Sequence, residues 1–133
     1  MGNYYGKEYA SPQIDAIYTA LRTVWKADTC APRMRAEWNE SNPSLGQCSV
    51  TAFAVQDLLG GEVYGVPLGD GNFHCFNLID GRIYDFTSEQ FVKALEYTLE
   101  YPQSRQAHFS KREKFARYGL LVERLKKALP EER

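Results

Sequence analysis

The chain has 133 residues, a length typical of one domain, so we expect a single domain over residues 1–133 with its own hydrophobic core. Sixteen basic and 17 acidic residues give a formal net charge of −1. This balance excludes the strongly basic surface of proteins that collect nucleic acids or anionic lipids. We therefore expect no nucleic-acid partner and no membrane partner.

The cysteine content indicates a reducing compartment. Three cysteines cannot all pair within one chain, and the sequence starts without a signal-peptide pattern, so we expect free thiols and a cytoplasmic protein. The longest apolar runs are interrupted by Asp57 and by Gly60-Gly61, which makes them too short to cross a bilayer.

Two helices and a long loop are predicted in the first half of the chain. The first helix begins after Ser11-Pro12, an N-cap followed by a proline in the first turn, and its apolar stripe extends to Trp25. Residues 26–46 lose this periodicity and predict an ordered loop, with Trp38 as its anchor. Residues 48–59 are apolar on almost every side, so we expect a buried helix at the centre of the fold.

The second half predicts a small antiparallel sheet followed by two helices. Residues 62–66, 73–79 and 82–86 have the composition of strands, and Asp80-Gly81 is a strong signal for a tight hairpin turn. Helical patterns then cover residues 89–99 and 111–129. The fold class that follows is α+β, with the central helix packed on the small sheet and amphipathic helices outside.

A thiol, an imidazole and a carboxylate stand out as candidate catalytic groups. Cys48 begins the central helix, and a two-residue turn places Asp85 opposite Phe76. His74 therefore shares a face with Asp85 and lies diagonal to it, roughly 7–8 Å away at the backbone. We expect Cys48 to be the nucleophile, His74 its base and Asp85 the group that orients the base.

The position of Cys48 at a helix start favours this chemistry. The positive end of the helix dipole and the unpaired backbone N–H groups stabilise a thiolate, and the same N–H groups can bind the oxyanion of an attacked carbonyl. A second oxyanion donor should come from a side-chain amide in the preceding loop. Asn42 and Gln47 are equally good candidates.

Each of these residues also has an ordinary structural explanation. A lone cysteine at the start of an apolar helix is most often a small buried hydrophobe. His74 is equally compatible with a hydrogen-bonded core position, and Asp85 with a cap for the next helix or an ion pair with Arg82. The shared face of His74 and Asp85 shifts the balance toward a site.

The remaining cysteines and histidine are expected to lie outside the site. Cys75 and Asn77 stand at odd spacing from His74, so they point to the opposite face of the sheet. Cys30 is expected to be structural, and His108 lies in a polar stretch that predicts a solvated side chain. A zinc site is disfavoured because no paired-cysteine spacing exists, and we expect no metal and no cofactor.

A family resemblance extends from about residue 25 to residue 91. It rests on Trp38, Asn42-Pro43-Ser44-Leu45-Gly46-Gln47-Cys48, Thr51-Ala52, Val55-Gln56-Asp57, Gly60-Gly61, His74, Asn77, Asp80-Gly81, Asp85-Phe86-Thr87 and Gln90-Phe91. This pattern resembles the YunG family of uncharacterised bacterial proteins, which has no settled activity.

The order of cysteine, histidine and aspartate is also similar to the papain-like superfamily, above all its transglutaminase-like and arylamine acetyltransferase branches. This similarity implies a papain-like core in which Cys48, His74 and Asp85 are nucleophile, base and orienter. Asn42 has the spacing to the cysteine of the oxyanion glutamine in papain-like proteases. The Cys-Gly-Ser-Cys-Trp context of those proteases is absent and the chain is short, so proteolysis is not favoured over other acyl chemistry.

The function predicted from the sequence is acyl transfer or amide hydrolysis through a thioester on Cys48, with water or an amine as the acceptor. The partner is then a peptide, amide or acyl substrate. The rival hypothesis is a non-catalytic binding or interaction module that keeps the fold and carries Cys48 as a buried relic. Reactivity of the thiol separates the two.

Overall fold

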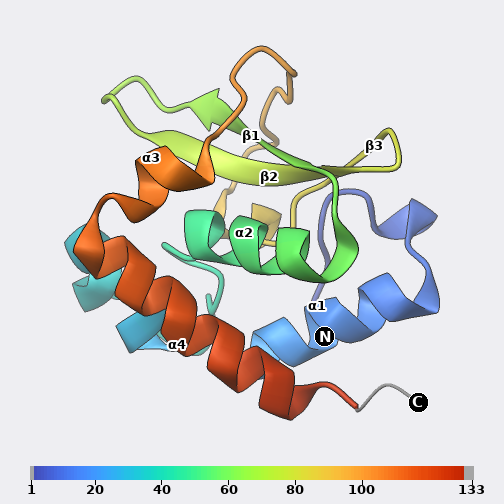
Figure 1. Ribbon diagram of the computed structural model, residues 1–133, viewed down its shortest axis with the longest axis horizontal. Coiled ribbons are helices and arrows are strands. Elements are labelled where there is room, and N and C mark those ends of the chain that lie inside the picture. Colours follow the sequence, from blue (N-terminus) through green and yellow to red (C-terminus); the bar gives the residue numbers. More distant parts are fainter. Residues whose placement is uncertain (1, 131–133) are drawn as a thin grey trace.

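The structure is a computed structural model that describes residues 2–130. The described residues form four α-helices, three strands and four short 3-10 helices (Figure 1). The α-helices are α1 (Pro12–Val24), α2 (Cys48–Leu59), α3 (Arg105–Phe109) and α4 (Arg112–Ala128). The strands are β1 (Glu62–Pro67), β2 (Phe73–Ile79) and β3 (Arg82–Tyr84). The chain is therefore a mixed α+β protein, as its sequence pattern predicts.

The sheet is antiparallel in the order β1-β2-β3, and its hairpin has the predicted register. Asp80 and Gly81 both have positive φ angles, 51° and 77°, as the tight hairpin turn requires. Ile79 accordingly pairs with Arg82. The third strand ends at Tyr84, two residues earlier than predicted, because the next residue pairs with the N-terminal segment instead of with β2.

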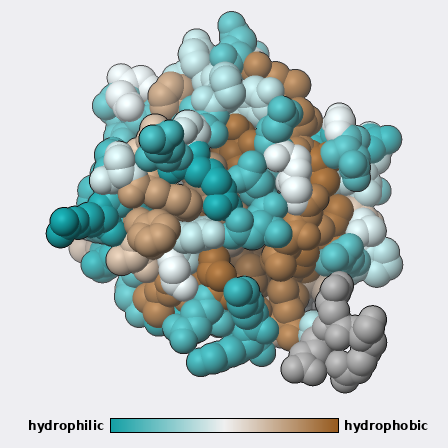
Figure 2. Space-filling model, viewed as in Figure 1, coloured by the Kyte–Doolittle hydropathy of each residue, from teal (hydrophilic) through white to brown (hydrophobic). Residues whose placement is uncertain are grey.

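Helix α2 lies between the sheet and the other long helices (Figure 1). Every residue from Ser49 to Val55 is buried, which confirms the prediction of a central helix. The odd-numbered face of β2 packs on α2, where the amide of Asn77 donates a hydrogen bond to the Ala52 carbonyl at 2.9 Å. Helices α1 and α4 cover the opposite side of α2. Hydrophobic side chains are visible over the seam between α2 and α4 in Figure 2.

The predicted helix over residues 89–99 is not present. The structure has only a short 3-10 helix, η4 (Ser88–Gln90), followed by irregular chain. Phe91 packs on His74 and Tyr97 packs on Phe76, with ring centroids 4.7 and 5.0 Å apart. In a helix these two rings would point about 120° apart. Irregular chain lets both rings reach the same face of the sheet, so tertiary contact overrides the local helical pattern.

The long loop over residues 26–46 is ordered and carries two 3-10 helices, η2 (Ala27–Thr29) and η3 (Pro32–Glu37). The indole of Trp38 donates to the Pro43 carbonyl at 2.9 Å, which ties the second half of the loop together. Among residues 2–130, no helix has both the length and the apolar character needed to cross a membrane.

Candidate functional site

The backbone before α2 brings Cys48 to a fixed position at the first turn of the helix. Gly46 has a φ angle of 71°, and a Cβ added to it would lie 2.5 Å from the sulfur of Cys30, so only glycine fits there. Its N–H donates to the side chain of Gln90 at 3.2 Å. Within the described chain the N–H groups of Cys48 and Ser49 have no acceptor, so they are free to bind a negatively charged oxygen.

His74 and Asp85 form a buried pair on the face of β2 that α2 does not cover. The Nε2 atom of His74 lies 2.6 Å from Oδ2 of Asp85, and each side chain is 1% exposed. Since Nε2 is engaged by the carboxylate, Nδ1 is the ring nitrogen left for the Cys48 thiol. The contact between His74 and Asp85 that the sequence predicts is therefore present.

The Asp85 carboxylate is fixed by more partners than the sequence indicated. The hydroxyl of Tyr97 donates to Oδ2 at 2.6 Å, and the N–H and hydroxyl of Thr87 donate to Oδ1 at 3.1 and 3.2 Å. Both oxygens are thus satisfied, and the carboxylate orients the imidazole rigidly. The sequence did not identify Tyr97 as a partner of Asp85, because the helix predicted over residues 89–99 does not place its ring at the carboxylate.

The environment of His74 keeps the imidazole charged. Burial alone would lower its pKa, but the hydrogen bond to Asp85, the hydrogen bond to Cys48 and the charges of both groups raise the pKa to about 10. The Phe91 ring packs edge-on against the imidazole at 88°. His74 therefore carries a proton at neutral pH and presents it toward the sulfur.

The Cys48 thiol lies against two donors, Cys75 and His74. The Cys75 side chain is the largest cause that holds the pKa of Cys48 well below its usual range. Burial opposes this effect, and the hydrogen bond and charge of His74 add to it. The pKa of Cys75 is raised well above its usual range by the same contact and by burial, so Cys75 keeps its proton. Cys48 is the thiolate of the pair.

The contact with Cys75 corrects the expectation that this residue stays outside the site. Cys75 does point to the opposite face from His74, as its spacing requires. That face, however, is the one covered by α2, and Cys48 lies at the end of α2 where β2 begins. Its sulfur is 4.0 Å from the carbonyl oxygen of Phe73, the first residue of β2. There it hydrogen-bonds the side chains of both Cys75 and His74, which lie on opposite faces of the strand. Among residues 2–130, the only side-chain hydrogen bond of Asn77 is the one to the Ala52 carbonyl described above.

Cys48 and His74 open into a cleft of about 610 Å³. Its walls come from η3, the loop between β1 and β2, the η4 region, α3 and the start of α4. A volume of this size suits a small molecule or a short peptide segment. Cys48 is partly exposed, whereas Cys30 and Cys75 are buried. A ligand in the cleft can thus reach the sulfur of Cys48.

Neither of the two side-chain amides predicted as oxyanion donors lines this cleft. The amide nitrogen of Gln47 donates to the Lys26 carbonyl at 2.9 Å, and its side chain is fully buried away from the opening. Asn42 belongs to a turn of the long loop, where its carbonyl accepts from Leu45. The residues that do carry amides into the cleft are Asn72, Gln90 and Gln103.

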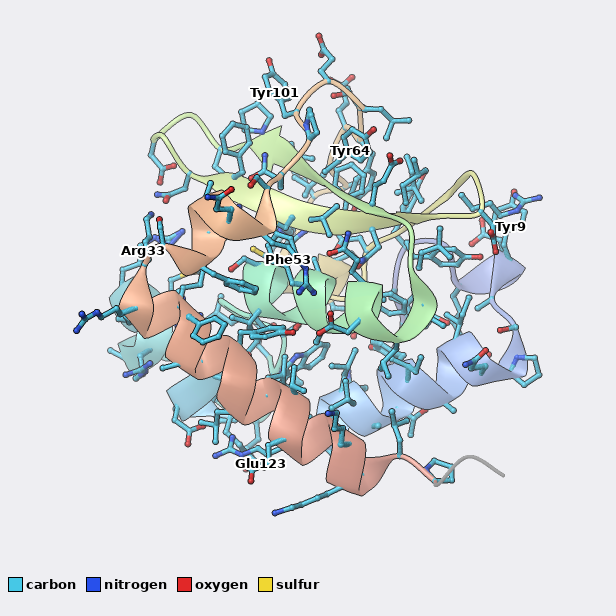
Figure 3. All side chains as sticks on the ribbon, in the orientation of Figure 1. Tyr9, Arg33, Phe53, Tyr64, Tyr101 and Glu123 are labelled. Atoms are coloured by element: carbon cyan, nitrogen blue, oxygen red, sulfur yellow. The ribbon has the colours of Figure 1, made fainter. Side chains whose placement is uncertain are left out.

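His108 is not the solvated residue that its polar surroundings predict. It lies on the cleft wall, half-buried, with its ring 5.2 Å from that of Phe53. Its Nε2 hydrogen-bonds Gln103 and its Nδ1 accepts from the Lys114 ammonium, both at 2.8 Å. Burial and then the charge of Lys114 lower the pKa of His108 to about 4, so the ring is neutral. Figure 3 shows Phe53 beneath the sheet.

The sequence model of the YunG protein family matches residues 13–130, nearly the whole chain. The chain belongs to the YunG family. A curated relative, "Uncharacterized protein YunG" from Bacillus subtilis (strain 168), is 45% identical over 74 residues. The match covers 56% of this chain and 63% of the relative, so the chain spans less than two thirds of that relative's length. No solved structure matches.

The chemistry available to this YunG protein is set by its own side chains. Within residues 2–130, no cluster of three or more histidine, cysteine or acidic side chains is placed to hold a metal ion. The cleft does contain a thiolate, a protonated imidazole and free backbone N–H groups side by side. That combination suits nucleophilic attack on a carbonyl carbon.

Proposed function

We propose that the protein is a cysteine-dependent acyl-transfer or amide-hydrolysing enzyme. The observation that carries the proposal is the contact of Cys48 with an imidazole whose other nitrogen is held 2.6 Å from the buried carboxylate of Asp85, with Cys48 and His74 both lining one cleft. The order and roles of these groups are those of a papain-like or transglutaminase-like site, and we assign the chain to that superfamily as part of the proposal.

The reaction begins with attack of the Cys48 thiolate on a carbonyl carbon. A carbon–sulfur bond forms, the π electrons move to the oxygen, and the resulting oxyanion accepts hydrogen bonds from the N–H groups at the start of α2. The tetrahedral intermediate collapses, and His74 donates its proton to the leaving amine as the carbon–nitrogen bond breaks. The products of this half-reaction are a thioester on Cys48 and a free amine.

The second half-reaction reverses these roles. Neutral His74 removes a proton from water or from an acceptor amine, which attacks the thioester carbon. The carbon–sulfur bond breaks, the acyl group leaves on its new acceptor, and the thiolate and imidazolium are restored. Asp85 keeps the imidazole oriented through both steps without giving up or taking a proton.

Trapping the thioester tests this proposal. The protein is incubated with p-nitrophenyl acetate, quenched in acid and analysed by intact and peptide mass spectrometry. We expect one acetyl group on Cys48, slower acetylation in His74→Ala, and none at this position in Cys48→Ala. Lys127→Met, on the far end of α4, is the matched control and should acetylate like the wild type. A wild-type protein that gains no acetyl group on Cys48 would instead support the binding module.

A further inference from the structure

Most of the charged side chains that line the cleft are positive. Four cationic side chains line it, Arg33, Lys111, Lys114 and Arg117, together with one carboxylate, Glu113. Glu113 is already paired with Arg117 within α4. The other three cations have no ion pair within 4.0 Å among residues 2–130. In a chain whose net charge is −1, this is a local concentration of positive charge.

The three unpaired cations approach the opening from two segments. Arg33 comes from η3, whereas Lys111 and Lys114 come from the start of α4. Figure 3 shows Arg33 at the same end of the molecule as the start of α4. The pKa of the exposed Asp70 carboxylate is lowered mainly by its hydrogen bond from the Asn72 N–H, at 3.0 Å, and only lastly by the charge of Arg33. The three cations thus border the same cleft as Cys48.

Lys114 is held in place far more firmly than a surface lysine. It is half-buried, and its ammonium donates to Nδ1 of His108 at 2.8 Å, while Nε2 of that ring is fixed by Gln103 at 2.8 Å. An ammonium has three donors, and only one of them is used among residues 2–130. A buried cation with free donors is stabilised by an anion that completes its hydrogen bonds.

We propose that the substrate of Cys48 carries an anionic group, a carboxylate or a phosphate, that binds Lys114 with help from Lys111 and Arg33 while its reacting carbonyl lies at the sulfur. This inference rests on the proposed acyl chemistry and names its substrate class. The cleft volume of about 610 Å³ accommodates a small acidic amide, ester or thioester. The net negative charge of such a substrate matches the three cations.

Two alkylating agents that differ only in charge provide the test. Iodoacetate and iodoacetamide both react by forming a carbon–sulfur bond to the thiolate as iodide leaves, so the ratio of their rates is independent of how much thiolate is present. We expect the iodoacetate to iodoacetamide ratio at Cys48 to exceed that of free cysteine by about tenfold or more, the size of one or two charged hydrogen bonds. Added salt should reduce the excess.

Charge-removing variants identify the source of the preference. Lys114→Met should bring the ratio most of the way to that of free cysteine, and Lys111→Met and Arg33→Met should each lower it less. Lys127→Met removes the same charge from the other end of α4 and should leave it unchanged. Protection of Cys48 from iodoacetamide by inorganic phosphate or by succinate then distinguishes a phosphate from a carboxylate on the substrate.

Failure of this inference is distinct from failure of the proposed function. If Cys48 reacts slowly with both agents, the thiolate itself is absent and the acyl chemistry is refuted. If Cys48 reacts fast but its ratio equals that of free cysteine, is unaffected by Lys114→Met, and neither anion protects it, the acyl chemistry stands and the anionic substrate is refuted.

Discussion

The imidazole of His74 and the carboxylate of Asp85 form a buried ion pair, with 2.6 Å between Nε2 and Oδ2 and each side chain 1% exposed. Breaking either partner would leave an uncompensated buried charge. Because the pair forms only in the folded chain, folding raises the pKa of the imidazole. It also holds a positive charge against the Cys48 sulfur at neutral pH.

The first prediction is a plateau in stability against pH. The raised pKa of His74 stabilises the fold fully below pH 6.5, and this contribution is lost as the pH rises toward about 10. The lowered pKa of Cys48 stabilises the fold above pH 9.0, and this contribution is lost as the pH falls. As the pH falls from 9.0 toward 6.5, folding takes up one proton at His74 and releases one at Cys48 for as long as Cys48 stays a thiolate, so over that interval the two groups together leave the free energy of unfolding constant.

Urea titrations across this pH interval measure the effect. Cys48→Ala removes the Cys48 proton and also the part of the raised His74 pKa that Cys48 supplies, which leaves Asp85 to hold the imidazole proton. The free energy of unfolding should then fall as pH rises above 6.5, by up to about 1.4 kcal/mol per pH unit. The double variant Cys48→Ala/His74→Ala supplies the baseline of all other groups. A Cys48→Ala profile as flat as the wild type's would show that the two protonations are not linked in this way.

The second prediction concerns the thiol behind the nucleophile. Because the Cys75 side chain is the largest cause of the lowered pKa of Cys48, Cys75→Ala should raise that pKa. Ultraviolet absorbance of the thiolate against pH measures the shift. Cys30→Ala removes a buried thiol elsewhere and is the control. An unchanged Cys48 titration in Cys75→Ala would mean that the imidazole and the helix start account for the thiolate alone.

The third prediction assigns a positioning role to Tyr97. Tyr97→Phe removes a donor to the Asp85 carboxylate and should cost about 1.5–3 kcal/mol of unfolding free energy. It should also slow acylation of Cys48, since the carboxylate then holds the imidazole less rigidly. Tyr101→Phe is the control, because that hydroxyl bonds to none of residues 2–130. Equal stabilities and rates for the two variants would remove Tyr97 from the site.

Local patterns predicted the central features of this molecule well. The Asp80-Gly81 turn fixes the hairpin register as far as Tyr84, because side chains alternate along a strand. Asp85 follows one residue beyond β3 and contacts His74 as predicted, although it pairs with Tyr5 instead of Phe76. The apolar run from Cys48 onward likewise indicated a buried helix that begins at the thiol. Both signals arise from residues that are close together in the sequence, so they can be recognised without knowledge of the fold.

The features that were missed depend on contacts between distant segments. Tyr97 reaches Asp85 only because the chain after η4 abandons its helical pattern to cover the sheet. The role of Cys75 depends on which face of β2 the helix covers, and strand alternation alone does not decide that. His108 meets the cleft on α3, a five-residue helix with no clear sequence signal, and Lys114 meets it from the start of α4.

The fourth prediction separates the site from the scaffold. Phe53 is fully buried between α2 and α3, so Phe53→Ala should cost about 3–5 kcal/mol through the cavity it leaves. Cys48→Ala at neutral pH should cost much less, because the side chain is small and borders the cleft. Thermal and urea unfolding of both variants measure these two losses of stability. A Cys48→Ala loss as large as that of Phe53→Ala would favour the buried-relic hypothesis.

The pH dependence of Cys48 alkylation is the most direct test of the central claim, which is that Cys75 and His74 together hold this cysteine as a reactive thiolate. Iodoacetamide labelling followed by peptide mass spectrometry reports each thiol separately, and Cys30, whose pKa is raised by burial, is the internal reference. We predict that Cys48 labels readily at pH 6, that His74→Ala moves its midpoint upward, and that Asp85→Asn moves it less. Labelling of Cys48 no faster than that of Cys30 at pH 6, unchanged in His74→Ala, would contradict the account.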